Sequence, residues 1–483
     1  MKKNIKIFIL IIVVIFPIML IACKNEEPDI GGENTVTISF NSNGGTEIES
    51  QTIKYGEKVS KPEGCEKKGY TLDGWYLNDE VWSFVGFSVT EDICLEAKWI
   101  PISYTIKYEI TSGQQNPDNP NNYTIEDEEI LLKELTQNLS LIFDGWYLDS
   151  ELTQPIKRIN CNICENIILY PKWTDEFYIR TKEDFLKFST NNLYIDKKIF
   201  LENDIDFSNQ VIVPIMTFKG IFNGNGHKLS NFILNSTFSH CGLFEQVSGA
   251  QIKNIALENF TINQTSQSVT TGALISNAND TLVENCYVKN GNFNITCDYG
   301  VIGGLIGSFV SSEIATYVKN CYSECDITAN ADIGGLIGSL CGTPYWTQTK
   351  QTLVLNCYSK CDIVSINEFG SVAGLISRTF NEGIEIRNCF SMSNLESGKT
   401  EMATSKLAGI VRFSELEEII IEKCYFINNA ILKENEKTIA NTDIYDSQKI
   451  DFETYSNIKN NLQLLWNDDW SFETEYPILK IFN

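Results

Sequence analysis

The chain of 483 residues contains only two histidines, His227 and His240. A sequence so poor in imidazole disfavours catalytic triads and histidine-ligated zinc sites. Positive charge is also scarce, because 38 Lys and Arg stand against 63 Asp and Glu, which gives a formal net charge of −25. So acidic a surface repels phosphate backbones, and nucleic acid is therefore not an expected partner. Neutral glycans, cationic protein patches and divalent cations remain as candidates.

Several sequence signatures of known chemistry are missing. The chain has no phosphate-binding loop, no nucleotide-binding fingerprint and no basic stripe interleaved with aromatic residues. What is present is a hydrophobic content of 43%, which argues against general disorder. The length allows about two to four domains with buried cores.

The first 22 residues have the pattern of an export signal. Lysines precede an apolar run from Ile5 to Ile21, which is short for a stable membrane span. The run ends in Leu20-Ile21-Ala22-Cys23, which resembles the lipobox of bacterial lipoproteins. The resemblance implies cleavage before Cys23 and acylation of its thiol, which would hold the protein to a membrane. The alternative is an uncleaved anchor helix with an incidental cysteine, and both interpretations place the rest outside the cytoplasm.

Two neighbouring segments share a pattern of short, alternating strands. Gly74-Trp75-Tyr76-Leu77 matches Gly145-Trp146-Tyr147-Leu148, and each copy closes on a Lys-Trp pair. The segments resemble the Listeria–Bacteroides repeat, the B repeat of internalin-like surface proteins. The second copy departs from the pattern because it lacks the Asn-Gly-Gly turn of the first. The resemblance implies small β-grasp-like modules that act as spacers or contact proteins, with Trp75 and Trp146 in their cores or, alternatively, exposed for sugar stacking.

The carboxyl half carries an internal repeat with a period of 32–36 residues. Glycine-rich Leu/Ile elements such as Gly303-Gly304-Leu305-Ile306-Gly307 alternate with elements such as Asn320-Cys321-Tyr322. Each period holds short β-type runs and no helical stripe, which favours one coil of a β-helix per period. Stacked coils would place a column of asparagines as an amide ladder and a column of cysteines inside. The columns are Asn285, Asn320, Asn356 and Asn388, and Cys286, Cys321, Cys357, Cys389 and Cys424.

These elements, with the Phe-Asn-Gly-Asn-Gly-His run that ends at His227, resemble GLUG-motif proteins, a group of bacterial surface proteins and adhesins. The resemblance implies a right-handed parallel β-helix and names no ligand. Thr181 is the expected N-cap of a short helix before it, and Trp470 with Tyr476–Leu479 is expected to close its end. Some GLUG relatives carry a zinc protease that cuts immunoglobulin A. That activity is not carried over, because the His-Glu-x-x-His motif is absent.

The 15 cysteines and a few polar residues are the remaining candidates for chemistry. Export permits disulfides, but the cysteine column is better explained as reduced core thiols. Cys161-x-x-Cys164 is either a redox or metal half-site or an ordinary loop pair. His227 is interpreted as a turn or cap residue.

Asp326, Asp362 and Asn394 occupy equivalent places in successive repeats. Such a column either binds Ca²⁺, as a β-helical polysaccharide lyase would require, or forms a solvated turn. A lyase also needs a base, and Lys319, Lys360 and Arg387 are the nearby cations.

We therefore predict an all-β protein of two β-grasp-like modules followed by a right-handed parallel β-helix with a short N-terminal cap helix. Its function is predicted to be adhesive or ligand-binding, with a glycan or a host or community protein as partner. No resident cofactor is required, although Ca²⁺ is possible. The alternatives are a Ca²⁺-dependent lyase or glycosidase and a structural stalk. The segments are a signal peptide (1–22), lipidated Cys23 and tether (23–35), module 1 (36–100), module 2 (101–174) and the β-helix with its caps (175–483).

Overall fold

A computed structural model describes residues 34–135, 141–342, 351–366, 370–380, 383–398, 407–412, 419–427, 430–434, 437–438, 440, 450–466 and 468–482. The signal peptide and Cys23 lie outside the described residues. In the described part, no helix is both long and apolar enough to cross a membrane. The chain forms two compact units. The first comprises the described residues up to Tyr108 with Pro117–Leu132 and Ile156–Leu169, and the second comprises Glu109–Asn116, Lys133–Pro155 and the described residues from Tyr170 onward.

The first module is a five-stranded sheet in the order β2-β1-β5-β3-β4. β1 and β5 pair in parallel, whereas the other pairs are antiparallel. Placing the first long strand parallel to the last is the β-grasp-like arrangement expected from the sequence. The strands are β1 (Thr35–Asn41), β2 (Gln51–Lys54), β3 (Tyr70–Leu77), β4 (Glu80–Val81) and β5 (Ile93–Pro101).

Aromatic side chains fill this small core. Trp75 is 1% exposed, and its ring lies edge-on to Phe40 with 5.0 Å between the ring centroids. Trp99 holds the turn that follows β1, because its Nε1 donates to the carbonyl of Ser42 at 2.9 Å. The expectation that Trp75 is a core residue is therefore confirmed.

The second module repeats the arrangement in the order β10-β9-β12-β6-β7. β6 and β12 form the parallel pair, and β9 pairs antiparallel with the later residues of β12. Trp146 is also buried, and its Nε1 donates to the carbonyl of Lys133 at 2.9 Å. The elements are β6 (Tyr104–Tyr108), β7 (Asn122–Tyr123), β8 (Ile130–Leu131), β9 (Ile142–Tyr147), β10 (Pro155–Ile156), β11 (Arg158–Ile159), η1 (Cys161–Ile163) and β12 (Ile167–Thr174), with β8 and β11 paired by themselves.

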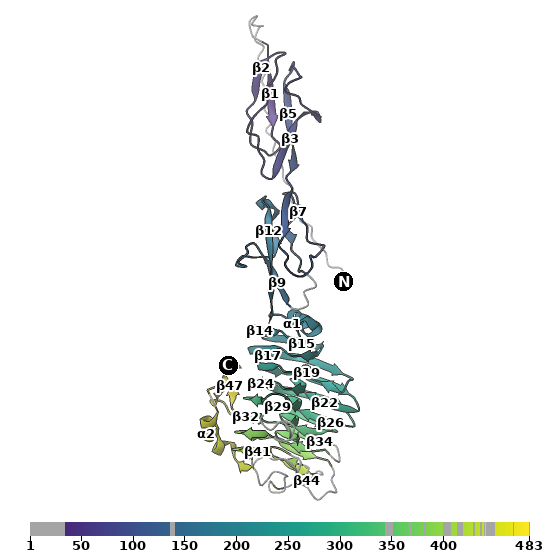
Figure 1. Cartoon of the computed structure of the whole chain (residues 1–483), viewed down its shortest axis with the longest axis vertical. Helices are drawn as coiled ribbons and strands as arrows, with labels where there is room; N and C mark the ends of the chain where they lie inside the picture. The colour runs from purple at the N-terminus through teal and green to yellow at the C-terminus, as the bar shows by residue number, and fades with distance from the viewer. Residues whose placement is uncertain are drawn as a thin grey trace, which may run out of the picture. The chain divides into compact units, whose positions relative to one another are not determined.

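From β13 onward the second unit is a parallel β-helix, whose strands stack coil upon coil (Figure 1). Its first face is a 21-stranded sheet, parallel except at β43–β44. This face contains β13 (Glu176–Ile179), β14 (Lys198–Leu201), β15 (Ile205–Ile212), β17 (Ile221–Ser236), β20 (Gln251–Glu258), β21 (Thr261–Thr265), β24 (Leu282–Glu284), β25 (Tyr287–Thr296), β28 (Thr316–Lys319), β29 (Tyr322–Ala329), β32 (Thr352–Leu355), β33 (Tyr358–Ser359), β34 (Asp362–Ser365), β37 (Ile384–Arg387), β38 (Phe390–Ser391), β39 (Asn394–Ser397), β41 (Ile419–Glu422), β42 (Tyr425–Ile427), β43 (Leu432–Glu434), β44 (Lys437–Thr438) and β45 (Asp451–Glu453).

Two six-stranded parallel sheets complete each coil. The second face contains β16 (Ile215–Phe218), β19 (Phe244–Ser248), β23 (Ile275–Asn279), β27 (Ile306–Val310), β31 (Ile337–Cys341) and β36 (Ile376–Phe380). The third face contains β18 (His240–Cys241), β22 (Ser268–Gly272), β26 (Tyr299–Gly303), β30 (Asp332–Gly334), β35 (Val372–Ala373) and β40 (Leu407–Ala408).

Like residues lie over like residues in this stack. Ile306, Ile337 and Ile376 pair in register and are fully buried. The glycines before them are required by close packing of the backbone. A Cβ on Gly334 would lie 1.9 Å from the carbonyl oxygen of Ile337, which no side chain can occupy. The repeated Gly-Leu-Ile elements thus encode the tight corner between the second and third faces.

The asparagine column forms the predicted amide ladder. Each Nδ2 donates to the Oδ1 of the asparagine one coil earlier, at 2.9–3.3 Å. The ladder asparagines from the second coil on also have φ between 52° and 57°. Asparagine tolerates this left-handed conformation better than most residues, which explains its choice at the turn. The ladder is longer than predicted and runs through Asn223, Asn254, Asn285, Asn320, Asn356 and Asn388.

The cysteine column fills the interior, and all five of its thiols are buried and free. Each lies within sulfur hydrogen-bond distance of the carbonyl two residues before it, for example 3.1 Å between Cys321 Sγ and Lys319 O. Burial raises the pKa of Cys321, Cys389 and Cys424 well above the ordinary thiol value. All five side chains therefore fill the core as free, buried thiols, as the sequence indicated.

α1 (Lys182–Thr190) covers the start of the β-helix. Thr181 is its N-cap, as predicted from the sequence, and forms a reciprocal capping box with Asp184. Phe185 and Phe188 are buried against the aromatic side chains of the first coils, including Phe207 at 5.1 Å from Phe185. η2 (Asn192–Tyr194) follows it.

The C-terminal segment differs from the expected end cap, because it lies along the flank of the coils. α2 (Tyr455–Leu465) and β46–β47 (Trp470–Ser471, Ile478–Leu479) lie beside the stack in Figure 1. They cover a ladder of Tyr287, Tyr322, Tyr358 and Phe390, whose rings stack with centroids 4.6–4.9 Å apart. η5 (Lys480–Phe482) reaches back to β17, where a Cβ on Gly226 would meet the Ile481 carbonyl.

Candidate functional site

The structure stacks Asp326, Asp362 and Asn394 on consecutive coils of the first face, as the sequence predicted. Both aspartates are exposed. Asn394 relieves the charge on its neighbour, because its Nδ2 donates to Asp362 Oδ1 at 2.6 Å, while its Oδ1 accepts from Ile431 N at 2.8 Å. Two carboxylates and one engaged amide fall short of the six to eight oxygen ligands that Ca²⁺ takes. Among the described residues, no group of three or more His, Cys, Asp or Glu is placed to hold a metal ion.

The cations near this column are engaged elsewhere. Lys319 Nζ lies 2.8 Å from Glu284 Oε1, and that hydrogen bond raises the pKa of Lys319. A general base needs a lowered pKa, so this shift has the wrong direction for catalysis. Arg387 forms ion pairs with Glu385 and Glu422 on its own and the neighbouring strand.

Lys360 lies apart from the other two, in a hollow that we call the flank hollow. Its Nζ lies 4.1 Å from the ring centroid of Tyr476. The hollow has a volume of about 510 Å³ and is lined by coil residues, including Met392 and Asn394, and by the C-terminal segment, including Tyr455 and Glu475. Burial raises the pKa of both Tyr455 and Tyr476, so neither phenol ionises near neutral pH. One carboxylate and one lysine face this space.

The remaining sequence candidates are structural. His227 lies after the turn at Asn225 and Gly226, and its Nδ1 is 3.0 Å from Asp204 Oδ1. Cys161 lies in η1, and Cys164 follows it in the left-handed conformation. Both thiols are free. The Cys161 Sγ is 3.1 Å from the carbonyl of Glu128, so it packs as a buried side chain.

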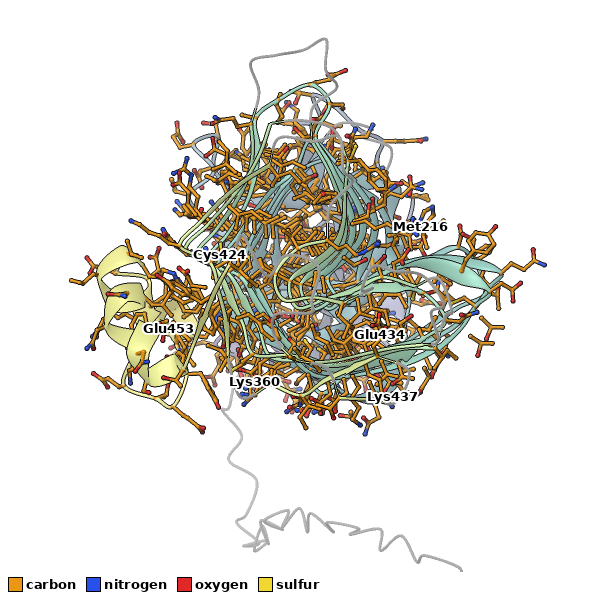
Figure 2. The ribbon with its side chains drawn as sticks, turned by 90° about the horizontal axis from the view of Figure 1, so that it is seen from below. Met216, Lys360, Cys424, Glu434, Lys437 and Glu453 are labelled. Atoms are coloured by element: carbon orange, nitrogen blue, oxygen red, sulfur yellow. The ribbon has the colours of Figure 1, made fainter. Side chains whose placement is uncertain are left out.

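A larger hollow, which we call the loop groove, was not found from the sequence. Its volume is about 640 Å³, and it lies between the loop after β17 and the strands β21 and β25. Exposed apolar side chains form one part of its wall, with Phe238 71% exposed and Met216 66% exposed. The groove lies on the opposite side of the coil from α2, as the positions of Met216 and Glu453 show (Figure 2).

The other part of its wall is polar. Asn235, Asn263 and Asn294 form a second amide ladder, with Nδ2 to Oδ1 distances of 2.9 Å at both steps. Of the described residues that line the groove, only Glu245 is charged, and burial raises its pKa. The arrangement is that of a binding site, with an apolar platform beside a row of hydrogen-bonding groups.

Comparison with known proteins identifies the two modules. Residues 37–98 and 104–172 match the family model of the Listeria-Bacteroides repeat domain. The repeat assignment made from the sequence is therefore confirmed for these residues, whereas the lipobox and GLUG resemblances stay predictions.

Two proteins of Evansella cellulosilytica are similar to parts of the chain. One, named "Putative membrane protein", is 33% identical over 150 residues, which is 30% of this chain and 22% of that protein. The other, named "Putative Gly-rich membrane protein", is 27% identical over 216 residues, or 44% of this chain and 23% of that protein. The chain thus spans less than a quarter of the length of either relative.

Two solved structures are similar as well. A crystal structure described as "a putative immunoglobulin A1 protease from Bacteroides ovatus" has a TM-score of 0.46 at 20% identity, over 63% of this chain and 92% of that one. A structure named "IgA1 Protease" has a TM-score of 0.38 at 12% identity, over 73% of this chain and 29% of that one. Both TM-scores lie below 0.5, so neither likeness supports an argument about activity.

Proposed function

We propose that this chain is a lipid-anchored cell-surface protein that binds a glycan or a protein of a host or community through its β-helix, without catalysing a reaction on it. The anchor is supported by the lipobox that ends at Cys23 and by relatives whose names call them membrane proteins. Acyl chains contribute about 0.8 kcal/mol per buried CH₂, and two or more chains hold a protein stably.

The observation that carries the binding role is the loop groove. Exposed Phe238 and Met216 lie beside an ordered row of side-chain amides, which together can bury and orient a ligand. A non-catalytic role is supported by the engagement of the cations that a lyase would need. Lys319 and Arg387 are paired with carboxylates, and Lys360 lies against Tyr476.

The anchor is tested by growing cells that express the chain with an alkyne-labelled fatty acid. The wild-type protein is expected to carry the label and to sediment with membranes, whereas Cys23→Ala is expected to be unlabelled. Unlabelled wild-type protein would contradict the lipid anchor.

The binding role is tested by measuring adhesion of cells that display the chain to immobilised glycans and extracellular proteins. Cells that lack the chain serve as the control. We expect at least one surface to retain the displaying cells alone, and equal retention of both cell types on every surface would contradict the binding role.

A further inference from the structure

The loop groove carries more information than the presence of a binding site. We propose that it binds a neutral glycan, with a sugar ring packed on Phe238 and its hydroxyl groups bonded to the amides of Asn235, Asn263 and Asn294. This inference rests on the proposed binding function and names the ligand class and the site.

The apolar platform is unusual for a soluble surface. Phe238 is 71% exposed and Met216 is 66% exposed, and Val213 beside them is 49% exposed. Neighbouring exposed apolar residues of this kind mark a binding surface more often than a single exposed residue does. The face of a sugar ring presents C–H groups that pack on an aromatic ring, whereas its edge presents hydroxyl groups.

The loop that carries Phe238 is held in place. Ser236 Oγ donates to the His240 carbonyl at 3.2 Å and accepts from Phe238 N at 3.1 Å. Gln264, which is 1% exposed, donates from Nε2 to the Phe238 carbonyl at 2.8 Å. The hydroxyl of Thr271 in turn donates to Gln264 Oε1.

A fully buried glutamine is therefore used to fix the backbone of an exposed phenylalanine. This arrangement holds the backbone at Phe238 in place, so little backbone entropy is lost when a ligand packs on the ring.

The amide ladder supplies matching polar groups. Its three asparagines come from adjacent parallel strands, so their amides repeat at about 4.8 Å. Within the ladder, Asn235 uses only its oxygen and Asn294 uses only its nitrogen. The N–H groups of Asn235 and the carbonyl of Asn294 are thus left for other partners. A row of donors and acceptors fits hydroxyl groups, which act as both.

The charge of the wall decides between ligand classes. The described residues that line the groove include one carboxylate, on Glu245, and no cation, and the chain as a whole has a formal net charge of −25. Uronic acids, sulfated sugars and phosphates would meet repulsion without a compensating Lys or Arg. An amphipathic helix would need a continuous apolar groove, which the amide row interrupts. A neutral sugar satisfies both parts of the wall.

The test compares two alanine variants of the chain from residue 24 on. Phe238→Ala removes the platform, and Tyr299→Ala removes an aromatic residue that is 59% exposed on β26 of the same β-helix, outside the groove. Binding is measured by isothermal titration calorimetry with hexasaccharides of glucose in α and β linkage, xylose, mannose and N-acetylglucosamine. Hexagalacturonate is the anionic control.

We expect at least one neutral hexasaccharide to bind the wild-type protein. Phe238→Ala should weaken that binding at least tenfold, and Tyr299→Ala should change it less than twofold. Equal loss in both variants, or no loss in Phe238→Ala, would overturn the assignment to the loop groove.

Binding of hexagalacturonate alone would overturn the neutral-glycan class, as would the absence of any hexasaccharide binding. In these cases the proposed function still stands if displaying cells adhere to a protein surface, and it fails only if they adhere to nothing.

Discussion

Asn320 links the asparagine ladder to the C-terminal segment by hydrogen bonds. It is fully buried and uses both N–H groups and both lone pairs of its amide. Nδ2 donates to Asn285 Oδ1 and to Asp469 Oδ2, each at 3.0 Å. Oδ1 accepts from Asn356 Nδ2 at 3.1 Å and from Trp470 Nε1 at 3.3 Å. Its φ of 52° is left-handed.

Two substitutions at this position separate the side chain from the backbone. Asn320→Gly removes all four hydrogen bonds but keeps the backbone relaxed, and we expect it to lower the free energy of unfolding by about 2–4 kcal/mol because buried polar groups lose partners. Asn320→Ala removes the same hydrogen bonds but keeps a Cβ in the left-handed region, which costs about 1 kcal/mol more than glycine does there. The matched control is Asn290→Gly, since Asn290 has a φ of 54° but is exposed and makes a single amide hydrogen bond, to Asn259 Oδ1 at 3.1 Å. We expect this control to change the free energy of unfolding by about 0.5 kcal/mol or less.

Urea unfolding followed by circular dichroism measures these differences as shifts of the midpoint. Equal stability of Asn320→Gly and Asn290→Gly would refute the energetic role of the ladder. Equal stability of Asn320→Ala and Asn320→Gly would refute the conformational explanation for asparagine at this turn.

Three further predictions concern other parts of the second unit. Gly334→Ala should abolish the recovery of folded protein. Gly249→Ala is the control, because Gly249 has a φ of 64° but no atom lies within 4 Å of the added Cβ, and it should lower the free energy of unfolding by only about 1 kcal/mol. Similar soluble yields of the two variants would contradict the packing argument. Glu245→Gln should raise the urea midpoint at pH 7, because the raised pKa of Glu245 means that folding disfavours its charged form. The gain in stability should fade as the pH drops below the ordinary carboxyl pKa. A gain that persists at low pH would contradict the unfavourable burial of the Glu245 charge. The five column thiols should react with a thiol reagent only after unfolding, because they are buried with raised pKa values at Cys321, Cys389 and Cys424, and rapid labelling of the native protein would refute their placement.

The repeats made much of the fold predictable. A column of like residues at a fixed period has few explanations other than stacked coils. The repeated Asn and Cys residues were therefore expected to lie one above another on successive coils. The helix after Thr181 was also predictable, because the residues of its N-terminal cap lie within the four consecutive positions 181–184. Local signals of this kind depend on sequence neighbours and need no knowledge of the tertiary structure.

The C-terminal segment was not predictable in the same way. α2 is rich in asparagine, and the side chain of its N-cap, Thr454, makes no capping hydrogen bond, so its sequence carries little helical signal. The helix is stabilised by the burial of Ile458 and Leu462 against the ladder of stacked rings that runs from Tyr287 to Phe390. That ladder includes Tyr358, and its tyrosines were visible in the Asn-Cys-Tyr motif. Nothing local, however, showed that these rings face outward toward a segment about 100 residues away.

The loop groove was missed for a related reason. Phe238 lies in the polar run Asn235-Ser236-Thr237-Phe238-Ser239, and a single apolar residue in such a run is a weak signal. Its backbone carbonyl accepts a hydrogen bond from Gln264, which comes from the next coil. The pairing of Asn263 and Asn294 could have been found by searching for asparagines near the repeat period, since these residues lie 31 positions apart.

The proposed function requires that the chain binds its ligand and leaves it intact. The most direct measurement is size-exclusion chromatography of residues 24–483 mixed with neutral and anionic polysaccharides, with and without Ca²⁺, in which both retention and polymer length are followed over time. We expect a neutral polymer to co-elute with the protein at unchanged length and without a need for Ca²⁺. A polymer that shortens with time would contradict the non-catalytic binding role and would make Lys360, Asp326 and Asp362 the first residues to substitute.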